Sequence, residues 1–197
     1  MFEGKLEELK NGFKQLPGIG EKTAERLAFY LISQDKQIGL NLAELIHDSV
    51  TSIQKCEQCN MLSEKSPCQF CSDDERDVAS LCVVEKSQDV YLIEETGVYN
   101  GKYFVLGNLI SPLDGIGPAH INFPKLQETI EKNSIKEIIL ALNPSSAGET
   151  TMSFLTSKLQ GPQIKITRLA TGLPVGGDIE YTSSKTLASA MTHRNEL

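Results

Sequence analysis

Four cysteines between residues 56 and 71 constrain the fold of this chain most strongly. They form two Cys-x-x-Cys pairs separated by eight residues: Cys56, Cys59, Cys68 and Cys71. Each pair can supply two thiolates to one tetrahedral ion, and the intervening loop is long enough to bring the pairs together. Four protein thiolates leave no open coordination position, so the spacing predicts one structural zinc ion per chain. A disulfide framework is disfavoured in a reducing cytosol, and a redox pair would not need a second copy.

The remaining candidate ligands do not extend this site. Cys82 lies inside a strand-like apolar run, which predicts a small core residue. The three histidines are scattered along the chain, and we interpret none of them as a metal ligand: His47, His120 and His193.

Length and charge limit the possible partners. The 197 residues are 40% apolar, enough for a sizeable core in one domain or two small ones. The longest apolar run is too short to cross a bilayer and the first residues are charged, so we expect a cytoplasmic protein without membrane contact. The net charge of -7 divides into -1 for residues 1–55, -4 for 56–80 and -2 for 81–197. Any binding of nucleic acid must therefore depend on locally arranged cations.

Two hydrophobic periodicities divide the chain. Apolar residues recur at helical spacing before the cysteines, at Phe2, Leu6, Leu9, Phe13 and Leu16 and again at Leu42, Leu45, Ile46, Val50 and Ile53. From Leu81 onward, four short β-branched or apolar runs follow, "LCVVE", "YFVLG", "EIILALN" and "IKITRLA". Stretches long enough for helices separate them, such as 125–133 and 150–160. This alternation predicts an α/β domain with a mostly parallel sheet.

The stretch "LPGIGEKTAERL", residues 16–27, predicts a tight turn that opens into an amphipathic helix. Gly18 and Gly20 permit the reversal, so that backbone amides ahead of the helix can converge on one anion. At 100° per residue, Lys22 and Arg26 lie opposite the apolar stripe, which consists of Ala24, Leu27, Ala28 and Leu31. This pattern is typical of a helix-hairpin-helix that holds the sugar-phosphate backbone. The alternative is a purely structural corner with two solvated cations.

Carboxylates at predicted strand ends raise a second possibility. Glu85 ends the first run, Asp89 follows one helical turn later, and Glu149 follows a later run. Open α/β sheets place their sites at such ends, and clustered carboxylates there could hold magnesium for phosphoryl chemistry. The acidic pair that a metal-dependent nuclease needs is incomplete, because Asn143 and Ala147 occupy the neighbouring positions. Solvated or partner-facing acids are the simpler interpretation.

Six motifs in order resemble the bacterial RecR family of recombination mediators. They extend from about residue 6 to residue 190 and are "LPGIGEKTAERLAFYL", the two Cys-x-x-Cys pairs, "LCVVE", "VLGNLISPLDGIGP", "ALNPSSAGET" and "TRLATGLPVGGDIEYTSSKTLASA". The resemblance implies a helix-hairpin-helix DNA-binding region (1–55), a four-cysteine zinc finger (56–79), a Toprim domain (80–170) and a C-terminal Walker B-like segment with its tail (171–197).

The resemblance also implies a function. Its members are similar to clamps rather than enzymes: they form ring-like tetramers and act with RecO or RecF to load RecA on gapped single-stranded DNA. By resemblance, Lys22 and Arg26 match the cations implicated in DNA binding. The resemblance also implies that the Toprim acids contact RecO. Ala147 stands where the family usually has an acid, so we expect the strength or mode of this contact to differ. In the Walker B-like segment, the carboxylates are Asp178 and Glu180.

Two other functions fit the same residues. One is a Toprim-type, metal-dependent nuclease, which would use the carboxylates around Glu85. The other is a zinc-containing scaffold that binds only proteins. Cleavage of gapped DNA in magnesium distinguishes the nuclease from the mediator, and direct DNA binding by an oligomer distinguishes the mediator from the scaffold.

Overall fold

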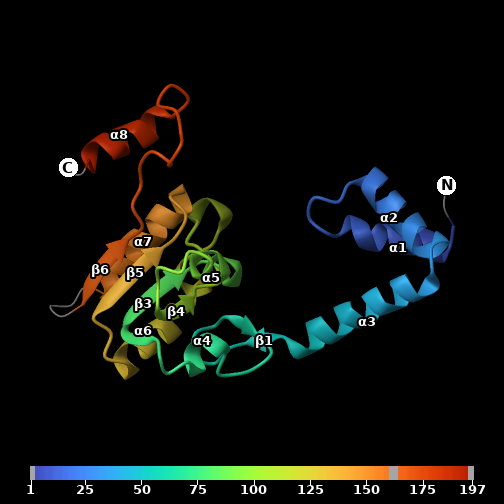
Figure 1. Ribbon diagram of the computed structural model, residues 1–197, viewed down its shortest axis with the longest axis horizontal. Coiled ribbons are helices and arrows are strands. Elements are labelled where there is room, and N and C mark those ends of the chain that lie inside the picture. The colour runs from blue at the N-terminus through green and yellow to red at the C-terminus, as the bar shows by residue number, and fades with distance from the viewer. Residues whose placement is uncertain (1–2, 160–163, 195–197) are drawn as a thin grey trace. The chain divides into compact units, whose positions relative to one another are not determined.

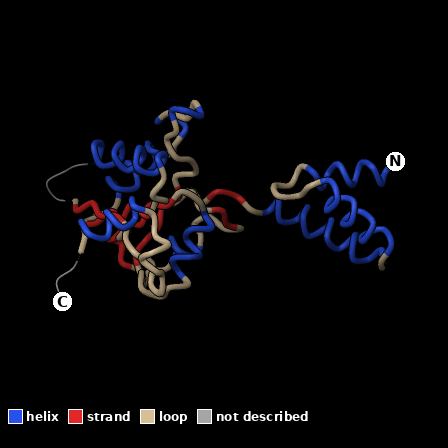
Figure 2. The backbone as a smooth tube through the Cα atoms, turned by 90° about the horizontal axis from the view of Figure 1, so that it is seen from above, coloured by secondary structure: helices blue, strands red, loops and turns tan. Residues whose placement is uncertain are grey.

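The computed structural model describes residues 3–159 and 164–194. Phe2 and the end of the helix expected at residue 160 therefore lie outside the described residues. The chain divides into two compact units, Met1–Ile53 and Gln54–Leu197, which we call the helical unit and the sheet unit. Figure 2 shows that helices build the first unit, whereas the strands of the described chain all belong to the second.

Three helices form the helical unit, α1 (Lys5–Lys14), α2 (Glu21–Ser33) and α3 (Lys36–Ser52). The turn before α2 follows the prediction, because Gly18 has a φ of 79° and Gly20 is the N-cap. The predicted stripe of α2 points inward, with Ala24 and Ala28 buried and Leu27 and Leu31 half-buried. Asp35 caps α3 by accepting a 3.0 Å hydrogen bond from the Gln37 amide.

A four-stranded, fully parallel sheet is the centre of the sheet unit (Figure 1). Its strand order is β4 (Gly101–Val105), β3 (Asp77–Val84), β5 (Glu137–Ala141) and β6 (Lys165–Arg168). Each of these strands overlaps one of the four predicted runs, so the predicted α/β class is confirmed. Because β5 lies on the other side of β3 from β4, the carboxyl ends of β3 and β5 meet at a switch point in the strand order.

Alternate residues of β3 face two different cores. Leu81 and Val83 contact the apolar residues of α6 (Phe123–Lys132) and α7 (Ser146–Leu159), including Leu126 and Leu155. Cys82 faces the opposite way and is buried, as predicted for a small core residue, and burial raises the pKa of its thiol to about 12.

The second face of the sheet is covered largely by the segment that contains the four clustered cysteines. Cys82 and Val84 share a core there with Val90 of α5 (Ser87–Glu94) and with Met61 and Phe70. The last two belong to the zinc-binding segment, residues 54–73, which contains the hairpin of β1 (Gln54–Lys55) and β2 (Leu62–Ser63) and the short helix α4 (Gln69–Ser72). This segment therefore takes the place of a covering helix.

The remaining elements connect the sheet to the C-terminal part. Two short 3₁₀ helices, η1 (Pro112–Asp114) and η2 (Pro118–His120), lie between β4 and α6, and α8 (Ser184–Thr192) is the last helix. Residues 171–183, which include the predicted Walker B-like stretch, form turns and irregular backbone in the structure. Within the described ranges, the helices are too short or too polar to span a bilayer.

An ion pair joins Arg76, which directly precedes β3, to Glu94 at the end of α5. The Arg76 guanidinium donates to both carboxylate oxygens of Glu94, at 2.9 and 2.5 Å, and the Tyr103 hydroxyl donates to Glu94 at 2.5 Å. Arg76 also lies over the Phe70 ring, 4.9 Å from its centroid. Hydrogen bonding from Arg76 lowers the pKa of Glu94 below its usual 4.5 and outweighs the opposite effect of burial. The carboxylate of Glu94 is therefore charged.

Replacing Glu94 by Gln should destabilise the sheet unit by about 1–3 kcal/mol, because Arg76 and Tyr103 lose a charged acceptor in a partly buried place. Since the pKa of Glu94 is lower in the folded chain, its stabilisation is fully present above pH 4.5 and is lost as the pH falls through the lower, folded value. Denaturant unfolding of wild type and Glu94→Gln at pH 7 and below pH 4 measures this. The adjacent, exposed Glu95→Gln is the control. A pH-independent deficit, or an equal deficit in Glu95→Gln, would contradict the ion-pair account.

Candidate metal centre and nucleic-acid interface

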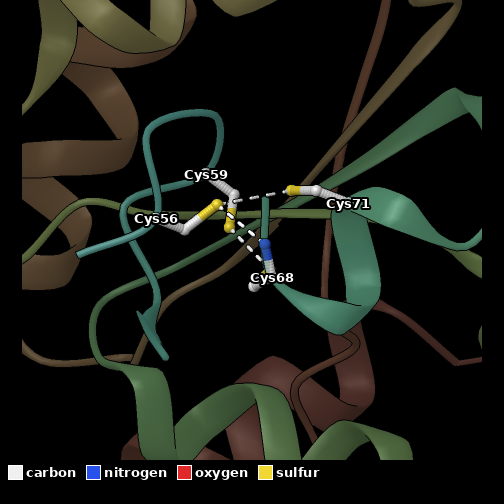
Figure 3. Close-up of side chains that lie close together, drawn as sticks. All are labelled: Cys56, Cys59, Cys68 and Cys71. Atoms are coloured by element: carbon white, nitrogen blue, oxygen red, sulfur yellow. Dashed lines mark hydrogen bonds between the residues drawn. The ribbon is translucent and has the colours of Figure 1, made fainter. Parts of the chain in front are cut away.

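The four predicted cysteines meet at one point of the zinc-binding segment (Figure 3). Cys56 and Cys59 come from the turn between β1 and β2, whereas Cys68 is the N-cap of α4 and Cys71 lies within it. Their sulfur atoms all lie within 4.8 Å of one another, with 3.9 Å between Cys56 and Cys71 and 3.5 Å between Cys59 and Cys68. Tetrahedral zinc with bonds of about 2.3 Å requires sulfur atoms about 3.8 Å apart. The four sulfurs therefore fit a zinc ion.

Electrostatics explain why this cluster needs a cation. The hydrogen bond from the Cys59 thiol lowers the pKa of Cys68, and the same bond raises the pKa of Cys59. By themselves, the crowded thiols thus favour one thiolate beside a protonated neighbour, because adjacent negative charges repel. A divalent ion offsets this repulsion, so four thiolates can coexist. The donor set is complete with protein ligands, and the zinc is structural.

Backbone contacts make the first cysteine pair a continuation of the sheet. The Val105 amide, at the end of β4, donates to the Cys59 carbonyl at 2.9 Å. Asn60, the next residue, has a φ of 63° and its side-chain amide donates to the Val105 carbonyl at 2.7 Å. Asn tolerates this left-handed conformation better than most residues. The turn between Cys56 and Cys59 is thereby fixed against β4.

The predicted cations of the helical unit are exposed beside the exposed turn. Lys22 and Arg26 lie on α2, immediately after Gly18 and Gly20. Neither side chain forms an ion pair or hydrogen bond with the parts of the chain that the structure describes. The amides in the first turn of α2 need acceptors from outside the helix. Two free cations and these amides form a suitable surface for a phosphate group.

The Glu21 carboxylate forms its ion pairs with lysines of α1 and not with Lys22 or Arg26. Its carboxylate pairs with Lys10 at 2.9 Å and also with Lys14, both on α1. Hydrogen bonding from Lys14 and Lys10 lowers the pKa of Glu21 to about 2, so the carboxylate stays charged and paired. These ion pairs join α2 to α1 at the start of α2, and they neutralise the acid that lies next to Lys22. Sequence spacing did not reveal them.

Two of the three predicted sheet-end carboxylates contact Lys86, and the third contacts Arg168. Glu85 lies 3.4 Å from the Lys86 ammonium, Asp89 accepts a 2.8 Å hydrogen bond from the Lys86 amide, and Glu149 lies 3.3 Å from Arg168 of β6. In the described chain, the four cysteines are the one group of three or more potential ligands close enough to hold a metal ion. Arg168, which the sequence analysis did not single out, supplies a cation next to Glu149.

The two C-terminal carboxylates are solvent-exposed. Asp178 accepts a 3.0 Å hydrogen bond from the Glu180 amide, which shapes a local turn. Apolar neighbours are exposed as well: Tyr181 is 85% exposed and Val175 is fully exposed. This segment presents acids and apolar side chains together to its surroundings.

Replacing Cys56 or Cys68 by Ser should abolish stoichiometric zinc binding and destabilise the sheet unit. Structural zinc contributes about 10 kcal/mol in isolated finger peptides, and a smaller share is expected in this larger core. Metal analysis of the purified protein and a thermal melt measure both effects. Cys82→Ser, which alters a buried thiol outside the cluster, should retain one zinc per chain. Full stability of a zinc-free Cys56→Ser variant would show that the metal is dispensable.

Comparison with known proteins relates the helical unit, the cysteine cluster and the sheet to known families. Three family models match the chain: the RecR helix-hairpin-helix over residues 6–50, the RecR four-cysteine zinc finger domain over 53–73 and the Toprim domain over 79–170. The chain is 43% identical to the recombination protein RecR of Bifidobacterium longum subsp. infantis, over 99% of this chain and 98% of that protein. It is 42% identical to RecR of Legionella pneumophila subsp. pneumophila (96% and 95%) and 38% identical to RecR of Saccharophagus degradans (100% of both). The chain therefore belongs to the RecR family of recombination proteins.

Proposed function

We propose that this protein is a non-enzymatic recombination mediator that encloses DNA as a clamp in the cytoplasm. In this proposal it acts with RecO, RecF or both to load RecA on gapped single-stranded DNA. The observation that carries the DNA-binding part is that Lys22 and Arg26 are exposed beside the Gly18 to Gly20 turn and have no ion-pair partner among the described residues. Family membership supports the recombination role, and the partner proteins follow from the resemblance described above.

One copy of this surface is too small for tight binding. Each chain offers two free cations at the turn, and its net charge is -7. Non-specific affinity for DNA grows with the number of phosphates neutralised, so a single copy gains little. A ring-shaped tetramer would present the surface four times around one DNA, and linked sites gain affinity through effective concentration. We therefore propose that the DNA-binding form is a homo-oligomer.

The helical unit supports this oligomer because its own core is small. Among its described residues, Ala24 and Ala28 are the only buried apolar side chains. A stripe of α3, continued by the C-cap residue Ile53, leaves its apolar residues between 39% and 76% exposed: Ile38, Leu42, Leu45, Ile46, Val50 and Ile53. At 100° per residue, these side chains span about 140° of the helix surface. An apolar face of this width normally packs against another element, and we propose that a second copy covers it.

The carboxylates favour partner contact over catalysis. Two-metal or one-metal phosphoryl transfer needs converging acids, whereas Glu85 and Asp89 contact Lys86, Glu149 contacts Arg168, and the three carboxylates do not form a ligand group within the described residues. We propose that these acids, and the exposed Asp178 and Glu180, contact protein partners. Ala147, on the first turn of α7, lies two residues from Glu149 and removes one carboxylate from that surface. The four-part division into 1–55, 56–79, 80–170 and 171–197 remains our proposal for the working regions.

Charge introduced on the stripe of α3 should dissociate the oligomer. Leu45→Asp with Val50→Asp places two carboxylates on the most exposed part of the stripe, 65% and 76% exposed in the chain. Burying either charge between copies would be costly, so the mass in solution should fall. Sedimentation or light scattering measures this. Leu113→Asp, at a position 97% exposed, is the control that should keep the wild-type mass. An unchanged mass in the α3 variant would exclude this face as the interface.

Replacing Lys22 and Arg26 by Ala should nearly abolish DNA binding while leaving the fold intact, because both side chains are exposed. Their contacts would be to the backbone, so the loss should be similar for unrelated sequences. The plot of log affinity against log salt should also become less steep. A salt titration with gapped DNA, with oligomer mass checked in parallel, measures both effects.

A matched variant separates local contact from net charge. Lys36→Ala with Lys65→Ala removes the same charge from two other exposed lysines and should bind nearly as well as wild type. Equal losses in both double variants would show a general charge effect and contradict the assignment of the turn. Magnesium in the same assay tests the nuclease alternative: wild type should leave the strands intact. Magnesium-dependent scission that Glu85→Ala abolishes would overturn the non-enzymatic proposal.

A further inference from the structure

Lys102 of β4 contacts the second cysteine pair although it is far from it in sequence. Its ammonium donates three hydrogen bonds to backbone carbonyls: Phe70 at 3.2 Å, Cys71 at 3.1 Å and Asp73 at 2.6 Å. A lysine ammonium has three donors, so the side chain is fully used. Lys102 is half-buried, and it lines a cavity of about 400 Å³ together with Cys59 and Cys71.

Within the described chain, no backbone amide outside α4 donates to these three carbonyls. Helix α4 is four residues long, and the amides of Cys71 and Ser72 both donate to the Cys68 carbonyl. The carbonyls after Cys68 lie at the open end of the helix, where no further turn supplies amides. A cation at a helix C-terminus is favourable as well. Lys102 therefore closes the end of the helix that carries Cys68 and Cys71.

The two cysteine pairs are attached to the sheet in different ways. The turn of Cys56 and Cys59 is attached by backbone and amide contacts to Val105. The Cys71 carbonyl, by contrast, is bonded to one side chain from β4. A zinc ion with four thiolates has a net charge of about -2, which a nearby ammonium also stabilises.

We propose that Lys102 is a positioning residue of the zinc centre. It fixes the backbone of Cys71 against β4 and holds this ligand in place, so that the metal leaves slowly. Zinc retention in this protein is thus controlled by a side chain of the sheet as well as by the four ligands. Groups that orient metal ligands typically change metal affinity 10- to 100-fold when they are removed.

The experiment measures zinc release from the full chain without denaturant, using excess 4-(2-pyridylazo)resorcinol as a metal-binding dye. Lys102→Met should release zinc about 10- to 100-fold faster than wild type. Lys102→Arg keeps the charge and the donors and should restore slow release. Lys132→Met removes an exposed lysine from the same cavity, where it pairs with Glu128, and should release zinc at the wild-type rate.

A second control separates positioning from general stability. Glu94→Gln removes the charged acceptor of Arg76 on the same face of the sheet. Glu94 forms no hydrogen bond with the carbonyls that Lys102 binds. At matched unfolding free energy, Lys102→Met should still release zinc faster than Glu94→Gln. If Lys102→Met cannot be purified with zinc, Lys102→Gln, which keeps one amide donor, replaces it in the same comparison. Release no faster than in Lys132→Met or Glu94→Gln, or no restoration by Lys102→Arg, would overturn the proposal.

Discussion

The packing of the zinc-binding segment on one face of the sheet is the constraint on which the sheet unit depends. Alternation along β3 directs Cys82 and Val84 away from α6 and α7, so this face needs its own cover. Helix α5 has eight residues and covers part of it. Residues 54–73 cover the rest, although a segment of this length cannot build a core alone. Zinc fixes the segment and the sheet supplies its core, so each makes the other stable.

Local sequence patterns predicted the elements of this fold better than their contacts. The cysteine spacing predicted the metal and its four ligands, and the short apolar runs predicted the four strands of the parallel sheet but not the short β1 and β2. In α2, the apolar period correctly separated the buried Ala24 and Ala28 from the exposed Lys22 and Arg26. Each of these features repeats within a few residues, so a local pattern records it. The RecR-type function came from the resemblance of whole motifs, because no local pattern indicates it.

Long-range polar contacts were not predictable from the sequence. Arg76 meets Glu94 across 18 residues, Arg168 meets Glu149 across 19, and Lys102 meets the carbonyls of residues 70–73 across 29 to 32. A charged residue in isolation is compatible with solvent, a partner or an ion pair, and spacing alone does not choose among them. The choice depends on the strand order, which places β4 beside the zinc-binding segment and β6 beside α7. The acids of the sheet unit are therefore better understood from topology than from their motif positions.

Assembly and DNA binding are linked in our proposal because both depend on the helical unit. Its buried apolar side chains are few, so contacts of α3 with another copy would add to its stability. The same unit presents Lys22 and Arg26, and Glu21 is already paired with α1. A ligand that favours the assembled state over the monomer must shift the equilibrium toward assembly. DNA that spans several copies is such a ligand, since each copy offers it two exposed cations at the turn before α2. An acidic chain can thus bind a polyanion by repeating a small cationic surface in which the neighbouring acid, Glu21, is already paired with α1.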